Sequence, residues 1–212
     1  NKLKEPNKNC SKCNRLKQFR IENKKKYPSW FNAPVPSIIQ DNSELLIVGL
    51  APGVTGANRT GRPFTGDHAG LILFNTLKKF GFSKGEYKED GFDDLKLDNC
   101  SITNAVRCVP PKNLPNNIEI KNCETYLQST IKSHENLRII IALGLISHKS
   151  IISSFNFKQK NFKFGHKNKH ELNKKITLID SYHCSRYNTN TKRLTQEMFD
   201  NIFIETKKIL AN

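Results

Sequence analysis

Four short segments of the chain have the apolar pattern of buried parallel strands. They are residues 44–50 (ELLIVGL), 100–108 (CSITNAVRC), 137–144 (LRIIIALG) and 177–183 (TLIDSYH). Strands that are buried on both faces form such short apolar runs, whereas a half-exposed strand alternates apolar and polar residues. The four segments therefore predict an α/β fold with a mainly parallel, four-stranded central sheet.

The segments between and after these strands are predicted to be helices that cover both faces of the sheet. In the first, apolar residues recur at helical spacing before Gly81 stops the helix; they are Leu71, Phe74, Leu77 and Phe80. The others begin near Asn117, span 145–155 and follow Leu194.

The most unusual residues of the chain follow the ends of three predicted strands. Residues 49–70 hold six of the eleven glycines together with Asp67. Residues 104–108 form the end of the second strand, and residues 183–190 follow the fourth. Glycines let a ligand approach the backbone closely, and ligands of open α/β sheets bind at the carboxyl ends of the strands. We expect the three segments to form one cleft. The glycine-rich segment matches neither G-x-x-x-x-G-K-[ST] nor G-x-G-x-x-G, so a nucleoside triphosphate or dinucleotide site is weakly supported.

The charge of the chain points to a polyanionic partner. Lys and Arg number 35 against 19 Asp and Glu among 212 residues, a formal net charge of +16. Such a field attracts nucleic acid and makes its binding depend on salt. A lysine- and asparagine-rich composition caused by an AT-rich genome is the alternative explanation. No apolar run approaches the ~20 residues that cross a bilayer, and the first residues lack a signal peptide, so we expect a cytoplasmic protein with no membrane partner.

The N-terminal residues and the cysteines predict a metal site. Residues 1–26 have ten Lys or Arg and almost no hydrophobic periodicity, which predicts an arm or a small metal-nucleated cap. We expect one domain over 1–212, with 1–43 as its basic arm. The C-x-x-C pair Cys10 and Cys13, with Cys108 and Cys123, suits zinc or an iron–sulfur cluster, and spacing does not choose between them. Unrelated thiols are the alternative, and for Cys100 and Cys184 we expect ordinary packing.

Three segments resemble the signature regions of the family 5 (type b) uracil-DNA glycosylases, within the uracil-DNA glycosylase superfamily. They are GLAPGVTGANRTGRPFTGDHAG (49–70), TNAVRCVPP (103–111) and HCSRYNTNTKRLT (183–195). The resemblance implies a three-layer α/β/α sandwich and an N-terminal arm held by a [4Fe–4S] cluster on the four cysteines. It also implies hydrolysis of the bond between uracil, or another deaminated base, and deoxyribose, which starts base-excision repair in a bacterial cytoplasm. The partner would be uracil-containing DNA, duplex or single-stranded, and the protein a monomer.

The resemblance also assigns roles to single residues. Asp67 matches the catalytic carboxylate, Phe64 the ring that stacks on the extruded base, and Asn104 the side chain that reads the edge of the base. His183 matches the histidine of an H-P-S motif. Further base-binding positions are Gly49, Ala51, Gly53 and Thr55. The expected DNA contacts are Arg59, Arg62, Ser185, Arg186, Asn188, Asn190 and Arg193.

Two positions depart from the family pattern. Thr55 replaces the histidine of an Ala-His-Gly sequence, which puts rate and substrate range in question, and Cys184 replaces the proline of H-P-S, which would loosen the loop. No lysine stands at a motif position where it would form a Schiff base, so we expect a monofunctional enzyme.

Other interpretations of the same residues remain open at this point. Asp67 would cap the helix that starts near Ala69, Phe64 would pack in the core, Asn104 would bond only backbone, and the arginines would be solvated. Residues 155–175 mix seven Lys with four Phe, which suits either a DNA track or an exposed hairpin with core-facing rings. The rival functions are a metal- or cluster-bearing DNA-binding module without catalysis, and a small-molecule phosphate-binding enzyme that would leave the cysteines and Asn104 unexplained.

Overall fold

A five-stranded sheet forms the centre of the protein. The structure is a computed structural model that describes residues 2–211. The strand order is β4-β1-β5-β7-β6, and the first four strands are parallel. They are β4 (Cys100–Asn104), β1 (Leu45–Gly49), β5 (Ile139–Leu143) and β7 (Thr177–Ser181). All four predicted strands and the mainly parallel sheet are confirmed.

The predicted number of four strands was wrong, because a fifth strand closes one edge. Strand β6 (Lys169–Glu171) pairs antiparallel with β7. It is three residues long with the sequence KHE, so it has no apolar run for pattern analysis to detect. Short, charged edge strands are a common way to end a sheet without exposing an apolar edge.

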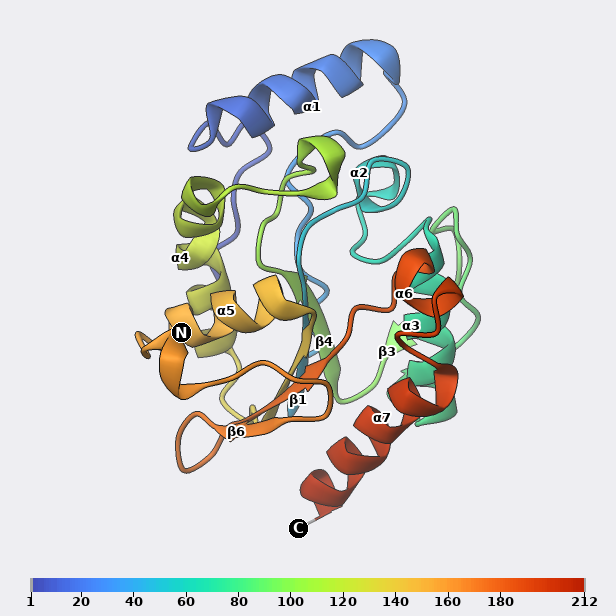
Figure 1. Ribbon diagram of the computed structural model, residues 1–212. Coiled ribbons are helices and arrows are strands. Elements are labelled where there is room, and N and C mark those ends of the chain that lie inside the picture. Colours follow the sequence, from blue (N-terminus) through green and yellow to red (C-terminus); the bar gives the residue numbers. More distant parts are fainter. Residues whose placement is uncertain (1, 212) are drawn as a thin grey trace.

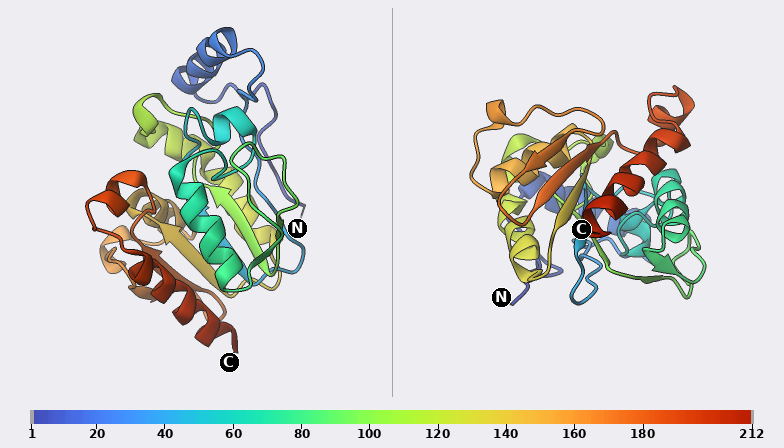
Figure 2. Two further views of the ribbon diagram at one scale, coloured as in Figure 1. Left: turned by 90° about the vertical axis from the view of Figure 1, so that its right-hand side faces the viewer. Right: turned by 90° about the horizontal axis from the view of Figure 1, so that it is seen from below.

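Helices cover both faces of the sheet, as expected (Figure 1 and Figure 2). Leu45 and Ile47 of β1 pack with α3 (His68–Lys79) and α7 (Gln196–Ala211) on one face. The alternate residues of β1 pack with α4 (Asn117–Ser133) and α5 (Leu145–Ser154) on the other. Successive side chains of a strand point to opposite faces, so an all-apolar strand requires cover on both. The result is a three-layer α/β/α arrangement.

The predicted helices are present, with one difference in the buried face. Helix α4 begins where expected, because Asn116 and Glu119 form a capping box, and α5 ends one residue before the predicted 155. In α3, however, Leu71 is exposed and Leu73 is buried in its place. The core-facing stripe of α3 is therefore Leu73, Phe74 and Leu77 rather than the predicted set.

A helix that the sequence did not reveal lies in the N-terminal arm. Helix α1 (Asn14–Lys26) crosses the end of the molecule in Figure 1 and buries one apolar side chain, Leu16. A helix with a single buried leucine has no apolar periodicity in its sequence. The three lysines in the last turn of α1 stabilise it, because their positive charge interacts favourably with the C-terminal end of the helix dipole. None of the described helices is both long and apolar enough to cross a bilayer. The short elements are α2 (Ala57–Thr60), β2 (Ser83–Lys84), β3 (Lys96–Leu97), η1 (Pro111–Asn113), η2 (Gln159–Asn161) and α6 (Arg186–Asn190).

Candidate active site

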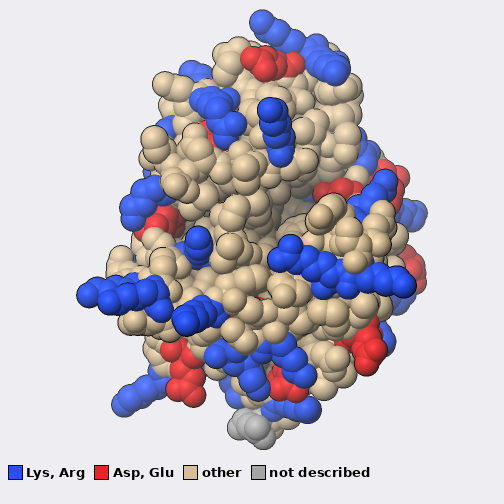
Figure 3. Space-filling model, viewed as in Figure 1, with Lys and Arg blue, Asp and Glu red and all other residues tan. Residues whose placement is uncertain are grey.

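A cleft opens at the carboxyl ends of the central strands. Gly49 and Asn104 are paired at the ends of β1 and β4, and both the glycine-rich loop and the segment after β7 reach this place. The cleft has a volume of about 690 Å³. Figure 3 shows the hollow near the middle of this face, with lysine and arginine side chains around it. The structure therefore confirms that the three segments come together in one cleft.

Asp67 is a helix cap and also lines the cleft. Its Oδ1 accepts a hydrogen bond of 3.0 Å from the Gly70 N–H in the first turn of α3. Its Oδ2 lies against the backbone of the glycine-rich loop, since a Cβ on Gly56 would be 2.6 Å from it and one on Gly53 would be 3.3 Å from it. One oxygen therefore caps the helix while the second lies on the cleft side, so capping and chemistry are compatible.

Phe64 and Asn104 approach each other across Gly49. A Cβ on Gly49 would lie 2.4 Å from both the Phe64 Cζ and the Asn104 Oδ1, so only glycine fits there. Phe64 has a left-handed backbone, with φ 54°, which a bulky residue adopts only where its surroundings impose it. No described residue hydrogen-bonds to the side-chain amide of Asn104, although that residue is only 4% exposed. Its donor and acceptor are thus available to a bound molecule.

His183 lies opposite Phe64, with the ring centroids 6.1 Å apart. Burial lowers the pKa of its imidazole, and the Asp67 carboxylate opposes this without cancelling it. The imidazole is therefore neutral near pH 7, when it carries one N–H that can donate. The Asn188 side-chain amide donates to the His183 carbonyl at 2.8 Å and fixes the backbone of the motif.

Cys184 is buried beneath the histidine motif and contacts the start of α3. The residue is fully buried, and its thiol donates to the Ala69 carbonyl in the first turn of α3 at 3.5 Å. Burial raises the pKa of this thiol to about 12, so it keeps its proton. The packing role expected for Cys184 is confirmed, and its hydrogen bond restrains the loop where the family pattern has proline.

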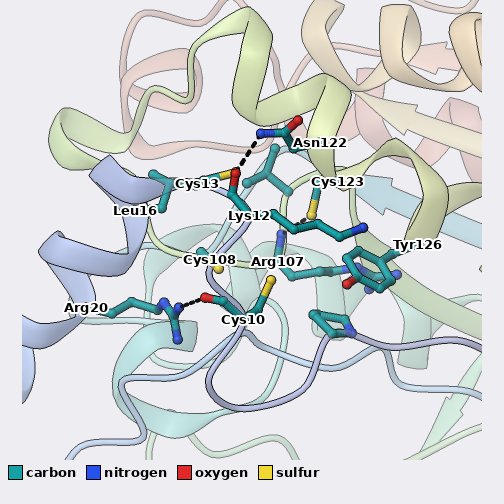
Figure 4. Close-up of a pocket in the computed structure, with 12 residues that line it drawn as sticks. Cys10, Lys12, Cys13, Leu16, Arg20, Arg107, Cys108, Asn122, Cys123 and Tyr126 are labelled. Atoms are coloured by element: carbon teal, nitrogen blue, oxygen red, sulfur yellow. Dashed lines mark hydrogen bonds between the residues drawn. The ribbon is translucent and has the colours of Figure 1, made fainter.

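The four predicted metal-binding cysteines line one pocket between α1, α4 and the segment after β4 (Figure 4). The Asn122 amide donates to the Cys13 Sγ at 3.5 Å, and the Arg107 backbone N–H donates to the Cys123 Sγ at 3.4 Å. Burial raises the pKa of Cys108 to about 12 and that of Cys123 to about 11. These thiols stay protonated unless a cationic group is bound to them.

The sequence matches known proteins over most of its length. Residues 36–207 match the sequence profile of the Uracil DNA glycosylase superfamily. The chain belongs to the uracil DNA glycosylase superfamily. It is 37% identical over 206 residues to the type-5 uracil-DNA glycosylase of Thermus thermophilus, a match that covers 94% of this chain and 93% of that protein. It is 35% identical over 194 residues to the type-5 uracil-DNA glycosylase of Pyrobaculum aerophilum, covering 89% and 84%.

More distant members of the superfamily are also similar. The type-4 uracil-DNA glycosylase of Sulfurisphaera tokodaii is 32% identical over 212 residues, covering 95% of this chain and 82% of that protein. The resemblance drawn from the three signature segments is confirmed by these matches.

Two of the arginines expected to contact DNA form hydrogen bonds or ion pairs with other residues of the protein. Arg59 donates to the Thr55 carbonyl at 2.8 Å and to the Glu89 carbonyl at 3.1 Å. Arg62 forms a two-pronged ion pair with Asp93, with contacts of 2.6 and 2.7 Å, and this pair lowers the pKa of the Asp93 carboxyl to about 2. Both guanidinium groups hold the loops that border the cleft, and the expected phosphate contacts at these two positions stay predictions.

The other predicted DNA contacts lie around the mouth of the cleft. Ser185 caps α6 and, with the exposed Arg186, lines the cleft. Asn190 is exposed at the end of α6, and Arg193 lies 4.9 Å above the Tyr182 ring. Of the remaining base-binding positions, Ala51, Gly53 and Thr55 also line the cleft, with Thr55 exposed at its rim.

Sequence reasoning missed three residues of this site. Glu89, from the acidic segment 85–98 (GEYKEDGFDDLKLD), lines the cleft together with Asn113. His68 bridges the two sides, because its Nε2 lies 2.9 Å from the Thr189 Oγ1 of α6. The position of His68 beside Asp67 in a signature segment was a signal for it, whereas nothing in the local pattern of Glu89 or Asn113 indicated the cleft.

Proposed function

We propose that this protein is a monofunctional uracil-DNA glycosylase that removes uracil, and other deaminated bases, from DNA and so starts base-excision repair. The observation that carries the proposal is the meeting of the Asp67 Oδ2, the Phe64 ring and the Asn104 amide in one cleft. A cleft of about 690 Å³ is in the range that takes a small ligand or one nucleotide. Its bacterial, cytoplasmic location is part of the proposal, since a type-5 relative occurs in Thermus thermophilus.

The arrangement suits the charges that develop when an N-glycosidic bond breaks. Positive charge builds on the sugar and negative charge on the departing base, so the site needs a carboxylate at one end and donors at the other. Asp67 supplies the carboxylate, which also orients or deprotonates the attacking water. Asn104 and the neutral His183 supply donors for the base, and Phe64 supplies a face on which an extruded base stacks.

The surface around the cleft suits DNA. The net charge is +16, and Figure 3 shows lysines and arginines on both sides of the hollow. Arg186 and the polar end of α6 lie at its mouth, where they would meet the strand beside the extruded nucleotide. The protein is proposed to act as a monomer. Binding should weaken steeply with salt, because phosphate contacts release counterions.

The cysteine pocket is proposed to hold a [4Fe–4S] cluster. Within the described chain, the four cysteines are not among the groups of His, Cys, Asp and Glu side chains that lie close enough together to hold a single metal ion. A single zinc ion with bonds of about 2.3 Å would need sulfurs about 3.8 Å apart. A four-iron cluster, which accepts four cysteine sulfurs, fits the wider set. Two buried arginines flank the pocket, Arg20 bound to the Cys10 carbonyl at 2.5 Å and Arg107 fully buried, and their charge suits an anionic centre.

The cluster proposal has a direct chemical test. Protein purified without oxygen is expected to be brown and to contain about four irons per chain. Cys123→Ala should lose the colour and the iron, whereas Cys100→Ala, a fully buried cysteine in β4 away from the pocket, should keep both. Stoichiometric zinc in a colourless protein would contradict the proposal.

The activity is tested on a labelled duplex that contains one G·U pair. We expect alkali-labile sites at the uracil and none in the matching G·C duplex. We also expect no adduct trapped by borohydride, because no lysine is among the described residues that line the cleft. Tight, salt-dependent binding without base release would instead support a DNA-binding module that lacks catalysis. No observation in the structure favours that second function.

A further inference from the structure

Two histidines and an aspartate form a buried cluster away from both the cleft and the cysteine pocket. His148 comes from α5, His170 from β6 and Asp180 from β7. The side chains of His148 and Asp180 are 1% and 0% exposed, and that of His170 is 13% exposed. Three distant parts of the chain therefore bring polar groups together inside the apolar layer between α5 and the sheet.

The hydrogen bonds of His148 require a positive charge between its Nδ1 and Asp180, either a second ring proton or a metal ion. Its Nδ1 lies 2.7 Å from the Asp180 Oδ1, and its Nε2 lies 2.9 Å from the Phe162 carbonyl oxygen. Both partners are acceptors, but a neutral imidazole has only one N–H. When the Nε2 proton bonds the carbonyl, the Nδ1 lone pair faces a carboxylate, and a cation between them removes the repulsion.

The same pattern is typical of histidines that bind metals. A ligating histidine usually donates its other ring N–H to a backbone carbonyl or a carboxylate, which fixes the tautomer. Phe162 supplies that carbonyl for His148. The Asp180 Oδ2 is held in turn by the Gly165 N–H at 3.3 Å and lies 3.0 Å from the His170 Nε2.

We propose that the His148 Nδ1, the His170 Nε2 and the Asp180 carboxylate bind one divalent ion of the zinc class. Two imidazoles and a carboxylate are a ligand set that zinc accepts, with a water in the fourth position. The three ligand atoms lie within 4.8 Å of one another. Bonds of about 2.0–2.1 Å place tetrahedral ligands about 3.3 Å apart. The present distances are 2.7 Å from the His148 Nδ1 to the Asp180 Oδ1 and 3.0 Å from the His170 Nε2 to the Asp180 Oδ2, so they need to widen by about 0.6 and 0.3 Å.

The residues around the cluster indicate how an ion would enter and which elements it would connect. His170 is the partly exposed member of the set and lies on the edge strand, so the water position faces that side. The rings of Phe164 and Phe162 lie 5.6 and 5.8 Å from the two imidazoles and restrict solvent elsewhere. A bound ion joins α5, β6 and β7 and fixes the lysine-rich segment 155–171, independently of excision activity and of the cysteine centre.

The test is a zinc titration of the full-length protein with its cysteine centre loaded, with iron measured on the same samples. Wild-type protein is expected to bind one zinc per chain and to melt at a higher temperature as free zinc rises above the dissociation constant. His148→Gln and His170→Gln should each weaken zinc binding at least about tenfold. His134→Gln is the control, because His134 is also buried but bonds only the Thr130 carbonyl and the Ser101 hydroxyl; it should bind zinc like wild type.

Substitution of the buried His148 can prevent folding. The decisive variant is therefore His170→Gln, which changes a partly exposed residue on the edge strand. Wild-type protein that binds no zinc outside the cysteine pocket would overturn the proposal. So would a folded His170→Gln variant that binds zinc as tightly as wild type. Either result would mean that a proton, and not a metal, sits between His148 and Asp180.

Discussion

Asp67→Asn is expected to lower the rate of uracil excision by about 10²–10⁴-fold while the protein stays folded. Asparagine is as good a helix cap as aspartate, so it preserves the bond from the Gly70 N–H that begins α3. It removes the negative charge at the Oδ2 position, which lies between Gly53 and Gly56 on the cleft side. The variant therefore separates the two roles of one side chain. Single-turnover excision from a G·U duplex measures the effect.

Asp67→Ala is the matched comparison, since it removes both the cap and the charge. It should lose excision to the same extent and also lose about 1 kcal/mol of folding free energy, seen as a lower melting temperature. DNA affinity should change little in either variant, because the contacts with phosphate lie elsewhere. Excision by Asp67→Asn within a few fold of wild type would show that Asp67 is a cap and nothing more.

Gly49→Ala is expected to reduce excision by about 10²-fold through displacement alone. The added Cβ would lie 2.4 Å from both the Phe64 ring and the Asn104 Oδ1, so both side chains must move into the space that the base needs. Displacements of about 1 Å near a reacting group are enough for a loss of this size. Steady-state kinetics should show the loss in both kcat and KM, because base binding and base orientation are both disturbed.

Gly53→Ala is the control for that substitution. It adds the same atom to the same loop, but its one close contact is the Asp67 Oδ2 at 3.3 Å. We expect an effect several-fold smaller than that of Gly49→Ala. Equal activity in Gly49→Ala and wild type would mean that Phe64 and Asn104 do not hold the base between them.

The central strands and the position of the cleft could be predicted from the sequence because each depends on local pattern plus topology. Residues 45–49 and 139–143 are apolar at every position but the last glycine of the first, and parallel strands necessarily end at one edge. Strand β6 and helix α1 were missed because charged side chains cover them and tertiary contacts, not local periodicity, decide their conformation. The conformation of such elements depends on tertiary contacts, which the local sequence pattern does not reveal.

The intramolecular partners of single arginines were harder to predict than the cleft itself. Arg59 and Arg62 stand in a glycine-rich loop of a basic protein, which favours contact with phosphate. Their partners, the Glu89 carbonyl and Asp93, come from a segment about thirty residues away that folds over the loop. The histidines and aspartate of the buried cluster are likewise scattered along the chain with no motif spacing. Pairings of this kind exist only in three dimensions.

One stretch of backbone serves two sites at once. Asn104 ends β4 in the cleft, and Cys108 lies in the cysteine pocket four residues later. Between them the side chain of Arg107 is wholly enclosed and bonds Thr103, Ser37 and Thr130. We therefore expect a substitution that moves this backbone at one site to disturb the other site as well. Variants of Asn104 are expected to affect the cysteine pocket as well as the cleft, because Arg107 lies between them.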